Sequence, residues 1–277
     1  MVDSVKVISH YGEKDLLERL DAALAAAGLG DGELAPEALA PLDQFHTRGL
    51  AATEELAKVA GLGAASMVLD IGSGLGGPSR YLASTFGCHV HGIDLSPTFV
   101  AAAHHLAQRS GLADRVSYEC ANALDLPYEM ETFDVVWTQH VAMNIADRGR
   151  LYGEALRVLR KGGRFAIYDV VTGNGEPLHF PVPWSREPGT SFLMTPDAMR
   201  AALEAAGFHI LEWTDRTAAA RAWFDERRKA SATGAVSQPL GLHLAMGTDF
   251  ARMAGNLGRN IAEGRAGILQ VVAERPR

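Results

Sequence analysis

The stretch VLDIGSGLGG, from Val68 to Gly77, decides how this sequence is expected to fold. A short apolar run passes through Asp70 and is followed at once by glycines, and then by PSRYLASTF, which has helical periodicity. This order predicts a strand, a tight turn and a helix, as in nucleotide-binding α/β folds. Gly72, Gly74 and Gly77 also satisfy the GxGxxG spacing, which alone is only a weak indication of a dinucleotide site.

Beyond this turn, short apolar runs alternate with stretches of helical pattern. Runs with the character of strands occupy 67–72, 88–95, 115–122, 133–139 and 164–171, and two later ones occupy 209–214 and 268–274. Strands that alternate with helices predict βαβ units and a parallel sheet. The expected fold class is therefore α/β: a doubly wound, seven-stranded, mostly parallel sheet of Rossmann-like type.

The N-terminal segment predicts helices rather than strands. Residues 13–28 repeat leucine and alanine at helical spacing and stop at a glycine, and a second helix is expected at 48–60. The stretch between them is rich in Gly and Pro and predicts a loop with short helical pieces. We therefore expect residues 1–60 to form an N-terminal helical cap and residues 61–277 to form the main domain.

Two later segments are too long for plain connections. Residues 172–195 are rich in Pro and Gly, and residues 217–264 predict two helices with a break near 234–241. Long insertions of this kind often form lids or binding loops. We expect both segments to contribute a helical and loop lid to the main domain.

Composition and charge restrict the partners. The 277 residues are 47% hydrophobic and carry a formal net charge of −7. Binding to a nucleic-acid backbone, which requires clustered Lys and Arg, is therefore not expected. Cys88 and Cys120 have no CxxC spacing, which argues against a metal site and a disulfide. The sequence has no apolar run of transmembrane length, and its start lacks the pattern of a signal peptide. A cytoplasmic protein without membrane insertion is expected.

Two aspartates at the ends of apolar runs indicate the kind of ligand. Asp70 precedes the turn in the pattern D-x-G-x-G-x-G, which includes Gly76. A carboxylate there suits a cationic ligand better than a pyrophosphate, because a pyrophosphate needs positive potential. Asp94 ends the next run, HGIDLS, where an acid can accept hydrogen bonds from both ribose hydroxyls of an adenosine. Asp94 therefore indicates a cofactor that contains adenosine, but it does not distinguish NAD from other cofactors of this type.

The segments VLDIGSGLGG, GIDLS, CANALDLPYEMETFDVVW and LRVLRKGGRF stand in the order and spacing of a known family. Over about residues 62–172 the sequence resembles the class I S-adenosylmethionine-dependent methyltransferases. LDQFHTRGLAATEEL and PVPWSREPGTSFL are further similar to UbiE-like (type 11) enzymes and their sarcosine/dimethylglycine N-methyltransferase branch. The resemblance implies S-adenosylmethionine as the cofactor and a small molecule as the methyl acceptor.

The resemblance also implies how the cofactor is held. Asp94 would bind the ribose, and Leu95 would pack on the adenine. The family often reads Gly-Asp-Ala where this sequence has Ala121-Asn122-Ala123, so Asn122 would accept from the adenine amino group without a charge, and the Ala123 amide would serve a ring nitrogen. Gln139 falls where the family offers a backbone contact to the methionine ammonium. The methionine moiety would lie against Asp70, Gly72, Gly74 and Gly76.

Three polar residues are candidates for catalysis. His140 follows Gln139 at the expected carboxyl edge of the sheet, where it would accept a proton, orient the nucleophile, or only support the cofactor. Asn144, four residues on, is either a substrate contact or a helix cap. The resemblance also implies that His46 and Gln44 fold over the site from the N-terminal cap, as their counterparts do in related enzymes. Tyr11 is a weaker candidate of the same kind.

Three aromatic side chains and two arginines each have two possible roles. Trp184, Phe180 and Phe192 could form an aromatic wall for the acceptor or anchor the long loop to the core. Arg48 and Arg186 could hold a carboxylate or could be solvated surface charges.

The sequence does not decide the chemical class of the methyl acceptor. A small amine such as sarcosine or dimethylglycine is favoured by the resemblance, and a natural-product or quinone-like ring methylated on O, N or C is the alternative. An NAD(P)-dependent oxidoreductase would need a Tyr-x-x-x-Lys constellation, which we do not find. A cofactor-binding protein without turnover is a rival from another class. The helical cap could also serve a homodimer.

Overall fold

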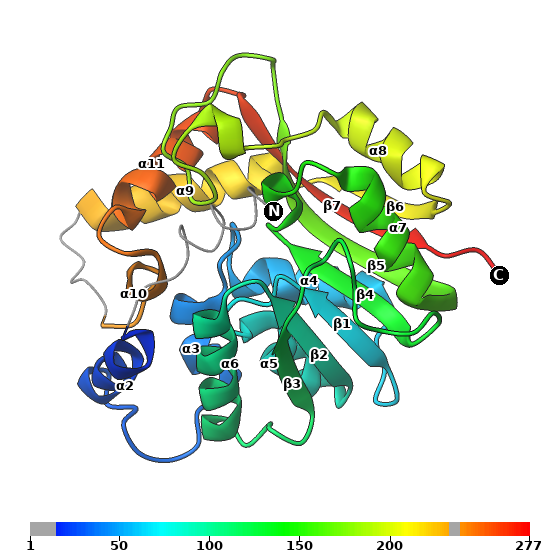
Figure 1. Cartoon of the computed structure of the whole chain (residues 1–277). Coiled ribbons are helices and arrows are strands. Elements are labelled where there is room, and N and C mark those ends of the chain that lie inside the picture. Colours follow the sequence, from blue (N-terminus) through cyan, green and yellow to red (C-terminus); the bar gives the residue numbers. More distant parts are fainter. Residues whose placement is uncertain (1–14, 233–238) are drawn as a thin grey trace.

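The structure is a computed structural model that describes residues 15–232 and 239–277. Its strands form one seven-stranded sheet with the order β3-β2-β1-β4-β5-β7-β6 (Figure 1). Neighbours from β3 to β5 pair in parallel, whereas β7 runs antiparallel to both β5 and β6. The predicted α/β class and the mostly parallel sheet are therefore confirmed. The strands are β1 (Met67–Ile71), β2 (His89–Asp94), β3 (Val116–Cys120), β4 (Phe133–Gln139), β5 (Leu159–Thr172), β6 (His209–Asp215) and β7 (Ala266–Glu274).

Helices cover both faces of this sheet. Side chains from α4, α5, α6, α9 and α11 join one apolar core, and side chains from α7 and α8 join the core on the opposite face. The α-helices are α2 (Leu16–Ala26), α3 (Pro36–Asp43), α4 (Leu50–Ala60), α5 (Gly77–Phe86), α6 (Pro97–Arg109), α7 (Arg148–Val158), α8 (Pro196–Ala205), α9 (Thr217–Ala232), α10 (His243–Met246) and α11 (Phe250–Ala262), and the short 3-10 helices are η1 (Ala142–Asn144) and η2 (Pro188–Thr190).

The central strand β1 shows why the apolar runs of this sequence are continuous. Val68 packs into the core beneath α4 and α5, whereas Leu69 and Ile71 pack into the core beneath α7. A strand that is covered on both faces needs apolar residues at successive positions. The strand ends at the glycine turn, which delivers the chain into α5 at the carboxyl edge of the sheet.

The N-terminal helices divide between two environments. Helices α2 and α3 form a third apolar cluster with α6 and α10, beside the sheet rather than on it (Figure 1). Helix α4 instead packs into the core of the sheet. The two predicted helices at 13–28 and 48–60 correspond to α2 and α4, and the division of the chain at residue 60 stays a prediction.

Hydrogen bonds join the two predicted lid segments. In the segment 172–195, the His179 amide donates to Asn260 Oδ1 of α11 at 2.8 Å, and Asn260 Nδ2 donates back to the His179 carbonyl at 3.1 Å. Asn256 Nδ2 also donates to the carbonyl of Pro181 at 2.9 Å. The segment 217–264 holds α9, α10 and α11, and part of its predicted break lies outside the described residues. None of the helices in the described ranges has the length and apolarity needed to span a membrane.

Candidate active site

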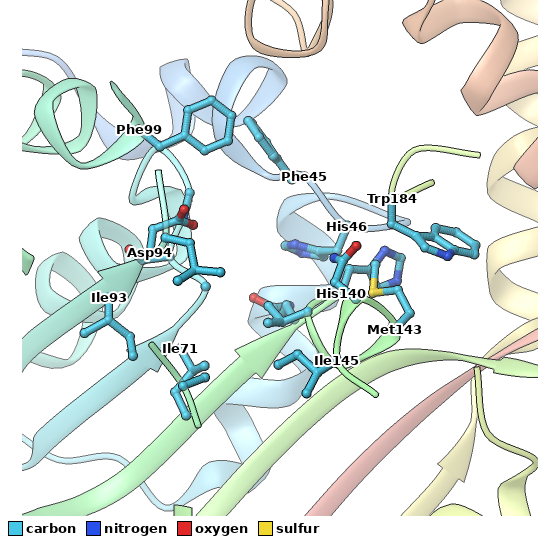
Figure 2. Close-up of a pocket in the computed structure, with 18 of the residues that line it drawn as sticks. Phe45, His46, Ile71, Ile93, Asp94, Phe99, His140, Met143, Ile145 and Trp184 are labelled. Carbon is cyan, nitrogen blue, oxygen red and sulfur yellow. The ribbon is translucent and has the colours of Figure 1, made fainter. Parts of the chain in front are cut away.

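A cavity of about 260 Å³ lies at the carboxyl ends of β1, β2 and β4. This is the edge of an open α/β sheet at which ligands bind. Figure 2 shows Asp94 and Phe99 toward one end, His46 and His140 in the middle, and Trp184 toward the other end. The cavity thus joins the predicted cofactor residues to the predicted catalytic residues.

The glycine turn shapes the floor of this cavity. Gly72 and Gly74 line it, with φ angles of +71° and +54° that favour glycine. A Cβ at Gly72 would overlap the side chain of Val141. Gly76, also predicted to contact the cofactor, lies outside the cavity lining, and a Cβ there would overlap the Tyr118 hydroxyl. Packing against Tyr118 therefore explains the glycine at position 76.

Asp70 and Asp94, the two predicted cofactor contacts, both line the cavity. Asp70 Oδ2 accepts a hydrogen bond from Ser79 Oγ at 2.6 Å, and Asp94 accepts from the amides of Gly74 at 3.0 Å and Ser96 at 2.8 Å. Burial, with a smaller contribution from Asp94, raises the pKa of Asp70 to about 7. Burial also raises the pKa of Asp94. Because a nearby positive charge stabilises the ionised carboxylate, this pair favours a cationic ligand.

Affinity for a ligand with an ammonium group is expected to fall as pH falls from 7 to 5.5. The pKa of Asp70 in the free protein is about 7, so below that pH a proton competes with the ligand for its carboxylate. The loss should approach about tenfold per pH unit if the ammonium requires the ionised form. Calorimetric titration of S-adenosylhomocysteine across this range measures it. Asp70→Asn should bind more weakly at pH 7 with a flatter profile, and an equally steep profile in this variant would contradict the assignment.

Leu95, Asn122 and Ala123 line the same end of the cavity. Asn122 Oδ1 already accepts from the Leu124 amide at 2.9 Å, which leaves one lone pair of this oxygen for a ligand. Phe45 and Phe99, which the sequence analysis did not identify, also line this end, with their rings edge to face at 5.7 Å.

The two histidines come together from distant parts of the sequence. Their ring centroids are 6.2 Å apart, and the His140 ring stacks on Tyr168 at 5.6 Å. His46 Nε2 lies 3.0 Å from the Gly49 carbonyl, which only accepts, so this nitrogen carries the proton in neutral His46. Burial lowers the pKa of His46 to about 4 and the pKa of His140 well below its usual value. Both rings are therefore neutral at pH 7.

Asn144, for which we predicted either a substrate contact or a helix cap, lines the cavity from η1. Trp184 also lines it, and its indole nitrogen donates to Ser191 Oγ at 2.9 Å. Phe180 instead packs against the core on the α4 face, and Phe192 lies outside the cavity lining. Of the three aromatic candidates, Trp184 is the one that the cavity includes.

The two candidate carboxylate clamps are paired elsewhere. Arg48 donates to both carboxylate oxygens of Glu55 at 2.8 and 2.5 Å, and Arg186 donates to Asp249 at 2.7 Å. Neither arginine lines the cavity. Tyr11 lies outside the described residues.

The charged residues that line the cavity are all acidic within the described part of the chain: Asp43, Asp70, Asp94 and Asp147. No cluster of three or more His, Cys, Asp or Glu residues suited to a metal occurs among the described residues. Met143 packs in the same apolar core as Trp184 and lies near it in Figure 2. Three apolar side chains of the lid also line the cavity, Leu242, Met246 and Phe250, and they were missed because apolar residues at helical spacing resemble core in a sequence.

Comparison with known proteins agrees with this geometry. Residues 69–167, from β1 into β5, match a protein family described as a methyltransferase domain. Residues 69–167 therefore belong to a methyltransferase domain. The predicted resemblance is thereby confirmed, and so is S-adenosylmethionine as the cofactor of the domain.

Relatives of this methyltransferase domain differ in the atom that they methylate. The sarcosine/dimethylglycine N-methyltransferase of Halorhodospira halochloris is 33% identical over 56% of this chain and 56% of its own length. The 27-O-demethylrifamycin SV methyltransferase of Amycolatopsis mediterranei (strain S699) is 37% identical over 56% of this chain and 54% of its own length. The chain spans about half the length, or less, of the curated relatives that it matches.

A solved structure shares the fold across nearly the whole chain. Geranyl diphosphate C-methyltransferase from Streptomyces coelicolor A3(2) superposes with a TM-score of 0.73 at 17% identity, over 99% of this chain and 98% of that chain. The fold of the methyltransferase domain therefore extends to the N-terminal helices and the lid segments. It does not identify the acceptor.

Proposed function

We propose that this protein is an S-adenosylmethionine-dependent methyltransferase whose acceptor is an uncharged, largely apolar small molecule. The observation that carries the proposal is a single cavity with Asp70 and Asp94 at one end, the neutral pair His46 and His140 in the middle, and an apolar wall with Trp184 at the other end. This alignment supports the proposal, because an acceptor atom bound between the two ends would lie beside the reactive end of the cofactor.

The residues at the Asp94 end fit this cofactor. Asp94 keeps lone pairs for ribose hydroxyls after its two backbone contacts. Among the described residues, no lysine or arginine lines the cavity beside Asp70, where it would repel an ammonium group or a sulfonium. A bound S-adenosylmethionine supplies a methyl group that is already activated on sulfur. The protein contributes alignment and the exclusion of water, and alignment alone can supply about 7–11 kcal/mol.

The charges of the cavity select among the acceptors. Sarcosine and dimethylglycine carry a carboxylate, yet no lysine or arginine lines the cavity in the described ranges. A desolvated carboxylate without a cation is costly. Arg48 and Arg186 are committed to Glu55 and Asp249. The apolar end suits the alternative, a natural-product or quinone-like ring methylated on O, N or C.

The neutral state of His46 and His140 limits the catalytic role that these side chains can have. A histidine whose pKa is lowered is a weak base, so His140 suits hydrogen bonding and orientation of a hydroxyl or amine whose proton leaves only as the methyl group is transferred, rather than prior deprotonation. Asn144 can add a second polar contact from η1. We assign His140, His46 and Asn144 to this positioning.

Two measurements test the function. Calorimetric titration with S-adenosylmethionine, S-adenosylhomocysteine and NADH is expected to show micromolar binding of the first two and no binding of NADH. Transfer of labelled methyl from the cofactor is then measured with phenols and quinols against sarcosine and dimethylglycine at matched concentration. Binding of NADH alone would make the protein an oxidoreductase candidate. Cofactor binding without transfer to any acceptor or cell extract would favour a non-catalytic binding protein.

A further inference from the structure

Gln139, the last residue of β4, has a buried amide nitrogen without a hydrogen-bond partner. The residue is 8% exposed and lines the cavity, and its Nε2 has no hydrogen-bond partner among residues 15–232 and 239–277. An amide nitrogen carries two hydrogens, and leaving them unsatisfied in the interior costs about 1–3 kcal/mol. Such a donor at the wall of a cavity indicates that a bound molecule supplies the acceptor.

The orientation of this amide follows from its neighbours. The indole nitrogen of Trp137 lies 3.0 Å from Gln139 Oε1, and an indole nitrogen can only donate. The atom facing it must therefore be the oxygen. Thr53 Oγ1 lies 3.2 Å from the same oxygen, but its single hydrogen is nearer to Gln44 Oε1, at 2.7 Å, so Trp137 alone fixes the orientation. A flipped amide would place two donors against each other at Trp137, so Nε2 is the atom without a partner.

The cofactor brings an anionic group that needs donors. Its aminoacyl tail carries a carboxylate as well as an ammonium group. The backbone amides of Gly72 and Ser73 already donate to the Ile93 carbonyl, and that of Gly74 already donates to Asp94. The buried Arg80 donates to Asp43 and to the Leu75 carbonyl.

The position of Gln139 agrees with this need. Strand β4 pairs in parallel with β1 in a register that sets Thr138 beside Ile71, so Gln139 follows at the level of the glycine turn. Cationic side chains do not line the cavity anywhere in the described ranges. Gln139 therefore offers a free buried donor where the methionine end of the cofactor is expected.

We propose that the side-chain amide of Gln139 donates through Nε2 to the carboxylate of the aminoacyl tail of S-adenosylmethionine. This contact is separate from the backbone contact to the ammonium group that the family resemblance implies. The inference rests on the proposed cofactor. It makes Gln139 a residue that selects a cofactor with an intact amino-acid tail over a plain thioether of adenosine.

The test compares two ligands on two variants. S-adenosylhomocysteine has the aminoacyl tail, and 5′-methylthioadenosine has the same adenosine and thioether without it. Gln139→Glu keeps an acceptor for Trp137 and replaces the donor by an oxygen, and Gln139→Met removes the donor without adding charge. In calorimetric titrations, S-adenosylhomocysteine should bind at least about tenfold more weakly to both variants, and more weakly to the Glu variant. Binding of 5′-methylthioadenosine should change less than about twofold.

Three other outcomes are possible, and each would contradict a different part of the proposal. Unchanged binding of S-adenosylhomocysteine to Gln139→Met would mean that the amide serves the acceptor or no ligand. An equal loss of both ligands, with a lowered melting temperature, would make the role of Gln139 structural. Failure of the wild-type protein to bind either ligand would overturn the proposed function, and this inference with it.

Discussion

Replacement of Asp94 by alanine is expected to weaken the binding of S-adenosylhomocysteine by about a hundredfold or more. The carboxylate ends β2 inside the cavity, where it can accept from two ribose hydroxyls, and a hydrogen bond to a charged group contributes about 1.5–3 kcal/mol. The same carboxylate accepts from the Gly74 amide, so its loss also loosens the turn. Calorimetric titration at pH 7.5 measures the change.

An exposed aspartate provides the matched control. Asp125 lies outside the cavity lining, its side chain is 87% exposed, and its nearest cation is Arg150 at 3.7 Å. Asp125→Ala should therefore bind S-adenosylhomocysteine as the wild type does. Should Asp94→Ala keep its melting temperature and bind within threefold of the wild type, the assignment of Asp94 to the ribose would be wrong.

Much of the sheet could be predicted because its strands are covered on both faces. The predicted run 133–139 coincides with β4, and the run 209–214 differs from β6 by one residue. Strand β5 is the exception, since it begins at Leu159 rather than near residue 164. The intervening KGG resembles a turn, with Gly162 at φ +77°, yet Leu159 already pairs with Phe133 across an irregularity in the ladder.

The order of the last two strands could not be read from the sequence. Alternation of strand and helix predicts parallel neighbours, but β7 inserts antiparallel between β5 and β6. Its residues 266–274 are almost all buried, and such a run looks the same in either direction. Pairing partners are set by packing over the whole chain rather than by local pattern.

The two ends of the cavity differed in how well they could be predicted. Cofactor residues stand at strand ends and in a glycine turn, and both features leave a local signal in the sequence. The lid adds Leu242, Met246 and Phe250 to the cavity lining, and apolar residues at helical spacing look like ordinary core in a sequence. The pairing of Arg48 with Glu55, which removes a carboxylate clamp, depends on a contact seven residues apart that sequence reasoning left open.

Replacement of Arg80 by methionine is expected to lower the free energy of unfolding by about 3–5 kcal/mol at pH 8. Arg80 and Asp43 form a fully buried ion pair between α5 and α3, and breaking such a pair leaves an uncompensated charge. Burial raises the pKa of Asp43 to about 6, while the Arg80 guanidinium lowers it, so the variant should raise that pKa further. Urea unfolding of the ligand-free protein at pH 5 and pH 8 measures the effect.

The pH dependence of this deficit follows from the protonation of Asp43. Below about pH 6 the carboxyl is neutral in both folded proteins, so the deficit should be small at pH 5 and should grow as pH rises through 6 and above. Arg115, which donates to the exposed Gly87 carbonyl at 2.7 Å, supplies the control, and Arg115→Met should change stability by less than about 0.5 kcal/mol at either pH. Adding Asp43→Leu to Arg80→Met should recover part of the loss at pH 8, because the remaining buried charge is removed. An equal deficit at pH 5 and pH 8 would show that the side chain of Arg80 contributes through packing rather than through its charge.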